Sequence, residues 1–430
     1  MSLNEAIYYS CENAEKETSS QPTKTKQQER LQDLKAFDAE CHYRNNNSSH
    51  HHEEISKGFI TLDSSLLIKY NNNNNNNKCI VGEIISEEEQ EGVTITLIDF
   101  SNNIEVDVFE KLVSKMRTRN VGFSNQFIHV HTLMDLGEVV TTGHGPYNWP
   151  YGVAISHKCK CILISDQYSN NISIFDLESK KLKTKLTTLF DPGCLCIESG
   201  KSERDDDSLI VSSCKNRVIY KWNNLESVVI KSINKERMPP FVWKQGDFGT
   251  PRGITIRYEK QSSFNTIFVC DNTKHNVTLL NSETGQILRA ISKLDGIYFG
   301  EPFGIALNNY GDLIVSEKYF NRVQILYLDS NSGEWISKIK FGSKEGTLKC
   351  PSGLLFDRVR EQIIVCDQEN QRISIYKENG ELLTTFGTFG VCKSSKDPNL
   401  LNYPTTVCLD EKSGELFVVD SWNIRVLVFK

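Results

Sequence analysis

The chain has 430 residues, of which 38% are hydrophobic, and its formal net charge is −6. This length allows one large domain or two smaller ones with real cores, and no apolar run approaches the roughly 18 residues that a membrane-spanning helix needs. The N-terminus has no basic stretch followed by an apolar one, so no secretory signal is expected. We therefore expect a cytoplasmic protein whose thirteen cysteines are free thiols.

The first 54 residues form a polar, low-complexity segment. It contains Lys, Gln and Glu runs, an Asn triplet at 45–47 and a His triplet at 50–52. A segment of this composition buries too little apolar surface to offset the entropy of folding, so we expect residues 1–54 to be disordered. The His triplet is interpreted as low-complexity sequence and not as a metal site.

Residues 55–136 are expected to form a small separate region, either α+β or β-rich. FITLDSSLLIKY (59–70) and CIVGEIISEEEQEGVTITLIDF (79–100) have the pattern of strands, whereas VDVFEKLVSKMRTR (106–119) has helical spacing. Seven consecutive Asn residues at 71–77 predict a solvated loop. These signals do not assign the region to a known fold.

From residue 137 onward the sequence is periodic, with six units of one pattern. Each unit opens with a proline, often in Pro-x-Gly, and an alternating run such as PFGIAL. A second apolar run ends in an acid or its substitute, as in IVCD, and a polar turn leads to a third run such as RISIY. Most units add a fourth short run, such as NGELLTTFG. The prolines that open the units are Pro150, Pro192, Pro251, Pro302, Pro351 and Pro404.

Four short antiparallel strands in each unit of about 50 residues form one blade of a β-propeller. Residues 137–430 are therefore predicted to be an all-β, six-bladed β-propeller. The proline precedes the first strand, where it removes no ladder hydrogen bond. The glycine is expected to permit backbone conformations that a Cβ atom would hinder.

The acid that ends the second run is followed, five residues later, by an Arg in three units. Because a catalytic group rarely recurs in every unit, we interpret these pairs as structural elements that hold the turn. The pairs are Glu317 with Arg322, Asp367 with Arg372, and Asp420 with Arg425.

The last unit ends after its third run, at Phe429 and Lys430. GEVVTTG at 137–143 is similar to GELLTTFG at 380–387, so we predict that residues 137–143 supply the missing strand and close the ring. Closure leaves no open edge between blades. LIDFSNNIEV (97–106) faintly echoes SDQYSNNISI (165–174), which keeps seven blades as an alternative.

The units resemble NHL repeats, whose pattern is Pro-x-Gly-Val, a strand ending in Asp, and then Asn-x-Arg-Ile-x-Val-Phe. The match is good in units four to six, fair in units one and three, and poor in unit two, where Ser213 replaces the acid. Unit six has Thr406 in place of the glycine. The resemblance implies a six-bladed propeller but not one activity, because function belongs to sites and not to folds.

The main functional hypothesis is a non-catalytic, monomeric scaffold that binds a protein or peptide. The loops that enter the first strands should converge on one face around the central channel, and aromatic and Arg side chains there suit protein contact. The residue after each opening proline is thus a candidate for partner binding. These candidates are Tyr151, Arg252, Phe303, Ser352 and Thr405.

RNA binding is the first alternative, because some NHL proteins bind RNA on such a face. It requires a basic face that carries aromatic side chains. Residues 141–430 hold 36 Lys and Arg against 33 Asp and Glu, whereas residues 1–140 hold 13 against 22. The near-neutral charge of the repeat region argues against a dedicated nucleic-acid binder.

A metal-dependent lactonase-like or lyase-like propeller enzyme is the second alternative. Asp191 and Glu301 could present carboxylates to one face, but two acids make a weak calcium site. The two Cys-x-Cys pairs, at 159–161 and 194–196, lack the usual spacing of zinc ligands. We therefore predict no metal, no cofactor and no catalytic residue. A third alternative is a substrate adaptor in ubiquitination that lacks its own RING module.

Overall fold

The computed structural model describes residues 120–134, 149–200, 206–259, 262–294, 296–344, 347–391 and 397–430, together with the backbone of strands β1 to β4, β6 and β7. The chain forms two compact units, Met1–Thr118 and Arg119–Lys430. The predictions of disorder in residues 1–54 and of a helix at 106–119 lie outside the described residues, as does the Asn run beyond residue 72.

The first unit contains a four-stranded antiparallel sheet in which the strands pair in chain order. These strands are β1 (Phe59–Asp63), β2 (Leu66–Asn72), β3 (Cys79–Ser86) and β4 (Val93–Ile98). They lie in the segments for which the sequence predicts strands. The strand β2 extends two residues into the Asn run, which was expected to be entirely loop.

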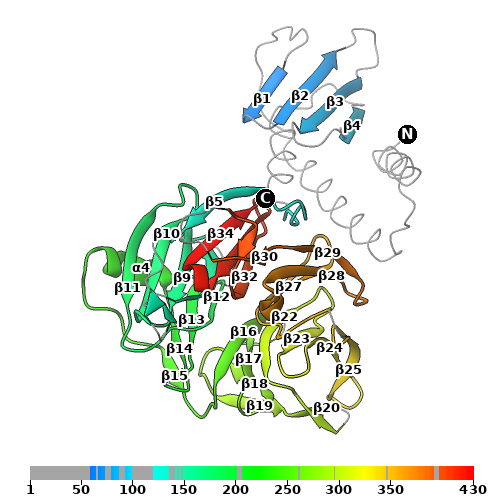
Figure 1. The fold of residues 1–430 in the computed structure, drawn as a ribbon. Coiled ribbons are helices and arrows are strands. Elements are labelled where there is room, and N and C mark those ends of the chain that lie inside the picture. The colour runs from blue at the N-terminus through cyan, green and yellow to red at the C-terminus, as the bar shows by residue number, and fades with distance from the viewer. Residues whose placement is uncertain are drawn as a thin grey trace. The chain divides into compact units, whose positions relative to one another are not determined.

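The second unit is a β-propeller of six four-stranded antiparallel sheets, each sheet forming one blade (Figure 1). The prediction of a six-bladed propeller is confirmed, and the seven-bladed alternative is wrong. Blade one consists of β8 (Pro150–Ser156), β9 (Cys161–Asp166), β10 (Asn171–Asp176) and β11 (Leu182–Thr187). Blade two consists of β12 (Leu195–Glu198), β13 (Ser208–Ser213), β14 (Val218–Trp222) and β15 (Trp243–Gln245). Blade three consists of β16 (Pro251–Arg257), β17 (Thr266–Asp271), β18 (Asn276–Asn281) and β19 (Ile287–Ile291).

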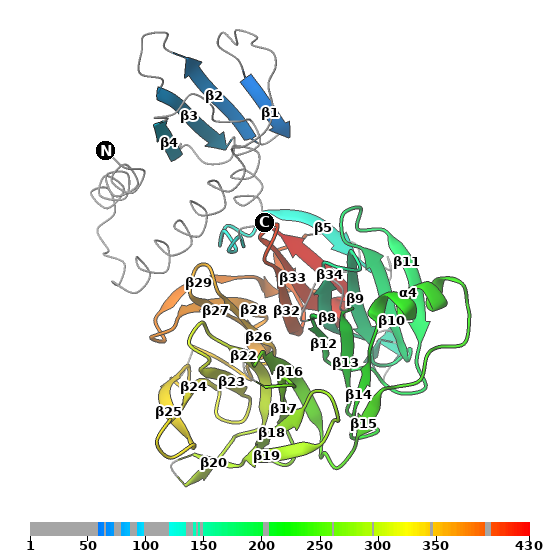
Figure 2. The ribbon, with the colours of Figure 1, turned by 180° about the vertical axis from the view of Figure 1, so that it is seen from behind.

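Blades four to six continue the same order around the ring (Figure 2). Blade four consists of β22 (Pro302–Leu307), β23 (Leu313–Glu317), β24 (Arg322–Leu328) and β25 (Trp335–Phe341). Blade five consists of β26 (Leu354–Asp357), β27 (Gln362–Asp367), β28 (Arg372–Lys377) and β29 (Leu382–Phe386). Blade six consists of β32 (Pro404–Asp410), β33 (Glu415–Asp420), β34 (Arg425–Phe429) and β5 (His129–Leu133). The first strand of each blade lies innermost, beside the first strands of its neighbours.

Burial decreases from the inner strands to the outer strand of a blade. Every residue of β9, β17 and β23 is buried, whereas only one of the six residues of β11 is buried. The inner strands are covered on both sides by neighbouring blades, so they are continuously apolar, while the outer strands keep one face in water. This gradient explains why the second run of each unit is the most regular signal in the sequence.

The ring is closed by β5, which pairs antiparallel with β34 of the last blade. Leu133 is paired with Val426, and the backbones of Ile128 and Lys430 bond to each other in both directions, at 3.1 and 2.8 Å. The prediction of closure by an N-terminal strand is therefore right, but its assignment to residues 137–143 is wrong. Within that segment, β6 (Thr141–Thr142) pairs with β7 (Gly145–Pro146).

The segment around β5 closes the ring because its side chains complete the core of the last blade. Phe123, Phe127 and Leu133 are buried, and Phe127 stacks on Phe386 with ring centroids 4.2 Å apart. HVHTL carries one buried apolar residue, so its own sequence gives a weak strand signal. The compact unit consequently begins at Arg119, before the start of the periodic pattern at residue 137.

The three predicted acid–Arg pairs lie in contact. The Nε atom of the Arg is 2.7 Å from Glu317, 2.7 Å from Asp367 and 2.9 Å from Asp420, and all three acids are fully buried. Each acid also accepts a 2.7 Å hydrogen bond from a backbone N–H in the loop that enters its own blade, at Gly300, Lys349 and Asn402. The acids therefore tie the end of the second strand to the start of the first.

In the second blade the acid lies in the entering loop and not at the end of the second strand, but it connects the same two segments. Ser213, which stands in the position of the acid, donates to Asp191 in the entering loop at 2.5 Å, and Asp191 also accepts from the backbone N–H of Lys215 at 2.9 Å. Asp191 is thus engaged in holding the turn.

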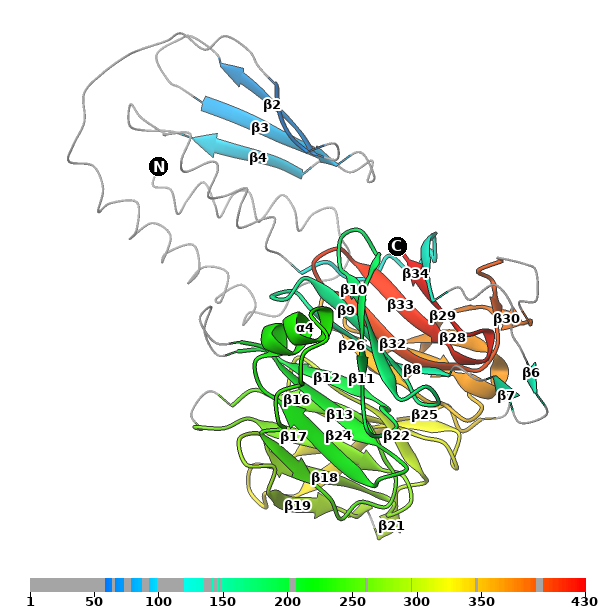
Figure 3. The ribbon, with the colours of Figure 1, turned by 90° about the vertical axis from the view of Figure 1, so that its left-hand side faces the viewer.

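The second blade also contains the helix α4 (Leu225–Ile233), between β14 and β15, which lies beside β11 of blade one (Figure 3).

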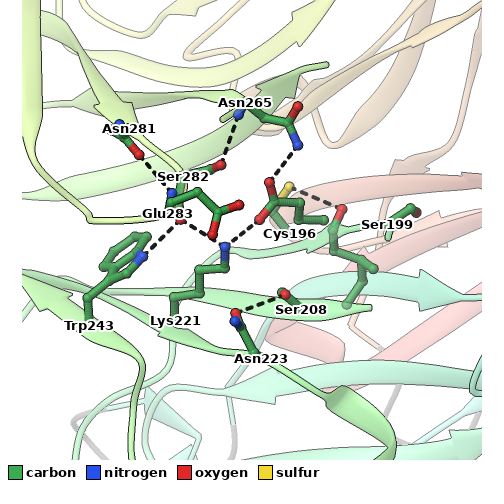
Figure 4. A network of polar contacts seen from close by, with 12 residues as sticks. Cys196, Ser199, Ser208, Lys221, Asn223, Trp243, Asn265, Asn281, Ser282 and Glu283 are labelled. Atoms are coloured by element: carbon green, nitrogen blue, oxygen red, sulfur yellow. Dashed lines mark hydrogen bonds and ion pairs between the residues drawn. The ribbon is translucent and has the colours of Figure 1, made fainter. Parts of the chain in front are cut away.

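A buried polar network joins blades two and three (Figure 4). The Nζ atom of Lys221 lies 2.6 Å from Oε2 of Glu198 and donates to the carbonyl of Ser282 at 2.8 Å. Asn265 donates to the other oxygen of Glu198 at 2.7 Å, and the indole N–H of Trp243 donates to the carbonyl of Ser282 at 2.9 Å. The side chains of Lys221 and Glu198 are 3% and 6% exposed. Their charges are therefore stabilised by each other and by these hydrogen bonds and not by water.

The glycine of Pro-x-Gly has a role different from the expected conformational freedom. At Gly152, Gly253, Gly304 and Gly353 the backbone φ is not positive, but an added Cβ atom would lie 2.4 to 2.6 Å from a carbonyl oxygen of the next blade. The glycine therefore allows the innermost strands of neighbouring blades to approach each other closely.

We expect Gly304→Ala to lower the free energy of unfolding by about 1–3 kcal/mol. The added Cβ would lie 2.4 Å from the carbonyl oxygen of Ser352, and two backbones would have to separate. Urea unfolding followed by circular dichroism measures this loss. Gly246→Ala is the matched control, since nothing lies within 4 Å of its Cβ position. Equal stability of the two variants would contradict the steric explanation.

Candidate binding site at the channel mouth

A cavity of about 520 Å³ lies where the entering loops meet the turns that follow the second strands. These loops and turns share one side of the ring because the strands of a blade are antiparallel. We call this cavity the channel mouth. It is lined by Trp149, Tyr151, Gln167, Tyr168, Asn170, Asp191, Lys215, Arg252, Phe303, Lys318, Gln368, Tyr403 and Thr405.

Arg252 lies against a pair of aromatic rings in the channel mouth, Tyr151 and Phe303, whose centroids are 6.1 Å apart. Its Nη1 atom donates to the hydroxyl of Tyr151, and its guanidinium carbon lies 5.5 Å from the centroid of Tyr151 and 5.3 Å from that of Phe303. The Nζ atom of Lys318 also lies near Phe303, 4.2 Å from its centroid. Such cation–π contacts strengthen when the cation is removed from water.

Burial decides the protonation of the neighbouring groups. It raises the pKa of the Tyr151 hydroxyl well above its ordinary value, so the group stays a neutral phenol. Burial also raises the pKa of the Cys194 thiol to about 12, and it raises the pKa of Cys214. These thiols are therefore protonated at neutral pH and are weak nucleophiles. Burial lowers the pKa of Lys318.

Four aromatic side chains form a cluster beside the cavity. The rings of Trp149 and Tyr168 stack with centroids 5.5 Å apart, Trp422 meets Trp149 edge-on at 5.8 Å, and Tyr403 lies 5.4 Å from Trp422. Tyr168 is 56% exposed and Trp422 is 39% exposed. Large, rigid aromatic side chains on a surface are the residues that most often carry binding energy in protein interfaces.

Four of the five predicted face residues line the channel mouth: Tyr151, Arg252, Phe303 and Thr405. Ser352 does not. It is fully buried, and its hydroxyl donates to the carbonyls of Pro404 and Thr405 in the next blade, at 3.1 Å each. Ser352 therefore joins two blades and presents nothing to a partner.

Sequence reasoning missed Lys215, Lys318 and Gln368 as well as the aromatic cluster. Lys318 and Gln368 directly follow the acids at 317 and 367, and Tyr168 and Trp422 stand two positions after the acids of their own blades. An acid at the end of a second strand is followed by a turn on the same side as the entering loops. Reading the two positions after each acid would have found these residues.

A second cavity, of about 370 Å³, follows the channel between the inner strands. Phe303 borders both cavities, and the second one is lined largely by inner-strand residues such as Ile254, Leu354 and Val407.

Among the described residues, no group of three or more His, Cys, Asp or Glu side chains is placed to hold a metal ion. No helix in this part of the chain has the length and apolar character required to cross a membrane.

Comparison with known proteins supports the repeat assignment. The NHL repeat family model matches residues 401–429, which contain the three strands β32 to β34. The chain is 29% identical over 132 residues to the B-box type zinc finger protein ncl-1 of Caenorhabditis elegans, which covers 30% of this chain and 14% of that protein. It is also 29% identical over 135 residues to Protein brain tumor of Drosophila melanogaster, covering 30% and 12%.

Among solved structures, a protein of unknown function from Bacteroides thetaiotaomicron has the same fold, with a TM-score of 0.50 at 12% identity. The similarity covers 87% of this chain and 90% of that one. The matched sequence thus spans only a small part of the two curated relatives, while the structural similarity concerns the fold alone. The chain therefore contains an NHL repeat in the last blade of a six-bladed β-propeller.

Proposed function

We propose that this propeller is a non-catalytic, cytoplasmic interaction module that binds a protein or peptide at the channel mouth. The observation that carries the proposal is the aromatic cluster of Trp149, Tyr168, Tyr403 and Trp422 next to a cavity with three cationic side chains. The cluster offers a large contact area in side chains that lose little entropy on binding. The acids of the blades hold the loops that carry it, so the surface is largely preformed.

RNA binding is a second candidate, and the same surface supports it. Trp149 and Tyr168 stack in the way that bases stack on aromatic platforms, and Lys215, Arg252 and Lys318 provide positive charge. Single-stranded RNA, however, requires cations along the path of its phosphates. Here the three cations converge on one cavity, which favours a protein partner.

A Tyr168→Ala, Trp422→Ala double variant should lose the specific partner of the propeller. Tagged wild-type and variant protein would be used to capture partners from native lysate, with and without RNase, followed by mass spectrometry. We expect proteins that resist RNase in the wild type and fall at least tenfold in the variant. Each candidate would then be tested by direct binding with purified protein.

Tyr310→Ala is the matched control, since Tyr310 is 70% exposed and lies between β22 and β23, at the opposite end of its blade. It should retain the partner. Loss of the captured proteins on RNase treatment would favour RNA as the ligand. Retention of the same proteins by the double variant would contradict binding at the channel mouth.

A further inference from the structure

The channel mouth contains hydrogen-bond donors for which the described residues supply no acceptor. Among the described residues, the buried side-chain nitrogens without a partner are Nε1 of Trp149 and Nε of Arg252. Both residues line the same cavity. A buried donor that lacks an acceptor costs roughly 1–3 kcal/mol, so native structures rarely keep one without a reason. Two such donors at one cavity indicate an acceptor supplied from outside.

The charges around the cavity are also unbalanced. Lys215, Arg252 and Lys318 face a single lining acid, Asp191, whose two oxygens accept from Ser213 and from the backbone of Lys215. Lys318 donates to the neutral amide of Gln368 at 2.7 Å. Within the described part of the chain, no carboxylate lies within ion-pair distance of any of these three cations. The cavity therefore attracts one or more negative charges.

The hydrogen-bond donors of Arg252 indicate which chemical group the site would bind. Its Nη1 atom is engaged by Tyr151, while its Nε and Nη2 atoms make no hydrogen bond to the described residues. These two atoms form one edge of the planar guanidinium. That edge presents two parallel N–H donors, whose spacing matches the two oxygens of a carboxylate. Tyr151 and Phe303 both contact the group and hold it in place.

We propose that the channel mouth is an anchor site for a carboxylate of the bound peptide, received by Arg252 with Lys318 and Lys215 around it. The inference rests on the proposed function, because the aromatic cluster would hold the neighbouring residues of the same peptide. The carboxylate comes either from an Asp or Glu side chain or from the C-terminus of the peptide. Asp191 in the lining disfavours a doubly charged phosphate group.

The test is a selection of random peptides against the full chain. One library displays peptides internally with no free C-terminus, and a second displays peptides that end in a free carboxylate. We expect selected peptides to share an acidic residue at one position or, in the second library only, to depend on the terminal carboxylate. For a selected peptide, replacing Glu by Gln or amidating the C-terminus should weaken binding at least tenfold and shows which source the site uses.

Arg252→Gln should weaken binding of the acidic peptide at least tenfold but leave its Gln or amide version unchanged. Arg252→Lys should restore only part of the loss, because Lys keeps the charge but not the two-donor edge. Lys318→Met provides an independent variant of the same site. Arg257→Gln is the control: Arg257 lies at the other end of β16, bonded to Glu259, and should bind like the wild type. Thermal melting verifies that each variant is folded.

The carboxylate anchor is wrong if the selected peptides carry no acidic preference, if that preference persists in Arg252→Gln and Lys318→Met, or if no peptide is selected. Selected peptides without an acidic preference that still require Tyr168 and Trp422 would leave the proposed function standing while removing the anchor. Displacement of acidic peptides by single-stranded RNA, with tighter binding of the RNA, would assign the cations to phosphates and overturn the inference.

Discussion

A chain that begins at residue 137 should fail to form a stable propeller. It would lack β5, so the main-chain groups of β34 that pair with β5 would lose their partners. It would also lack Phe123, Phe127 and Leu133, which are buried in the last blade and its border with the neighbouring blades. Burial of each such side chain contributes about 1.5–3 kcal/mol, and the total approaches the roughly 5–15 kcal/mol that stabilise a typical protein.

The matched control is a chain that begins at residue 119, which keeps all of these contacts and should unfold cooperatively. Circular dichroism and size-exclusion chromatography would compare the two. We expect the shorter chain to aggregate or to lack a cooperative thermal transition, because it exposes an open strand edge. If both chains melted within a few degrees of each other, closure by β5 would not be what stabilises the ring.

Lys221→Met should lower the free energy of unfolding by about 3–5 kcal/mol. The substitution removes the ammonium group that lies 2.6 Å from Glu198, and it leaves a carboxylate that is 6% exposed with Asn265 as its remaining donor. It also removes the hydrogen bond to the carbonyl of Ser282 in blade three. Urea unfolding of the full chain measures the loss.

Adding Glu198→Gln to Lys221→Met should restore much of the lost stability, because the uncompensated charge disappears while a carbonyl oxygen can still accept from Asn265. Lys377→Met is the control for the loss of an ion pair at the surface. Its partner Glu381 lies at 3.0 Å, both side chains are about half exposed, and the change should be within about 1 kcal/mol. A double variant as unstable as Lys221→Met alone would show that the charge of Glu198 is not the cause.

Part of the channel mouth could be predicted from the sequence, and part could not. The position after the opening proline led to Tyr151, Arg252 and Phe303 because each entering loop has the same place in its blade. The same rule failed at Ser352, where the side chain turns into the next blade and bonds to its carbonyls. A repeat position defines a place on the backbone, but the neighbouring blade decides whether the side chain lines the cavity.

The sequence by itself determined the repeat and the inner strands of the blades, and it favoured six blades over seven. The alternation of apolar residues, the opening prolines and the acid at the end of the second strand are local signals, and each recurs within its own unit. The pairing of Glu317 with Arg322 could also be expected, since five residues across one turn bring the two side chains together.

Only the tertiary structure decided which segment closes the ring, why the glycines are required and which side chains meet at the channel mouth. Each of these depends on residues far apart in the chain: β5 meets β34 across nearly 300 residues, Gly304 approaches the backbone of Ser352, and Arg252 meets Tyr151 across 101 positions. A pattern within one unit contains no information on what the next unit places against it. The convergence of residues from six blades on one cavity therefore becomes visible only when the ring is closed.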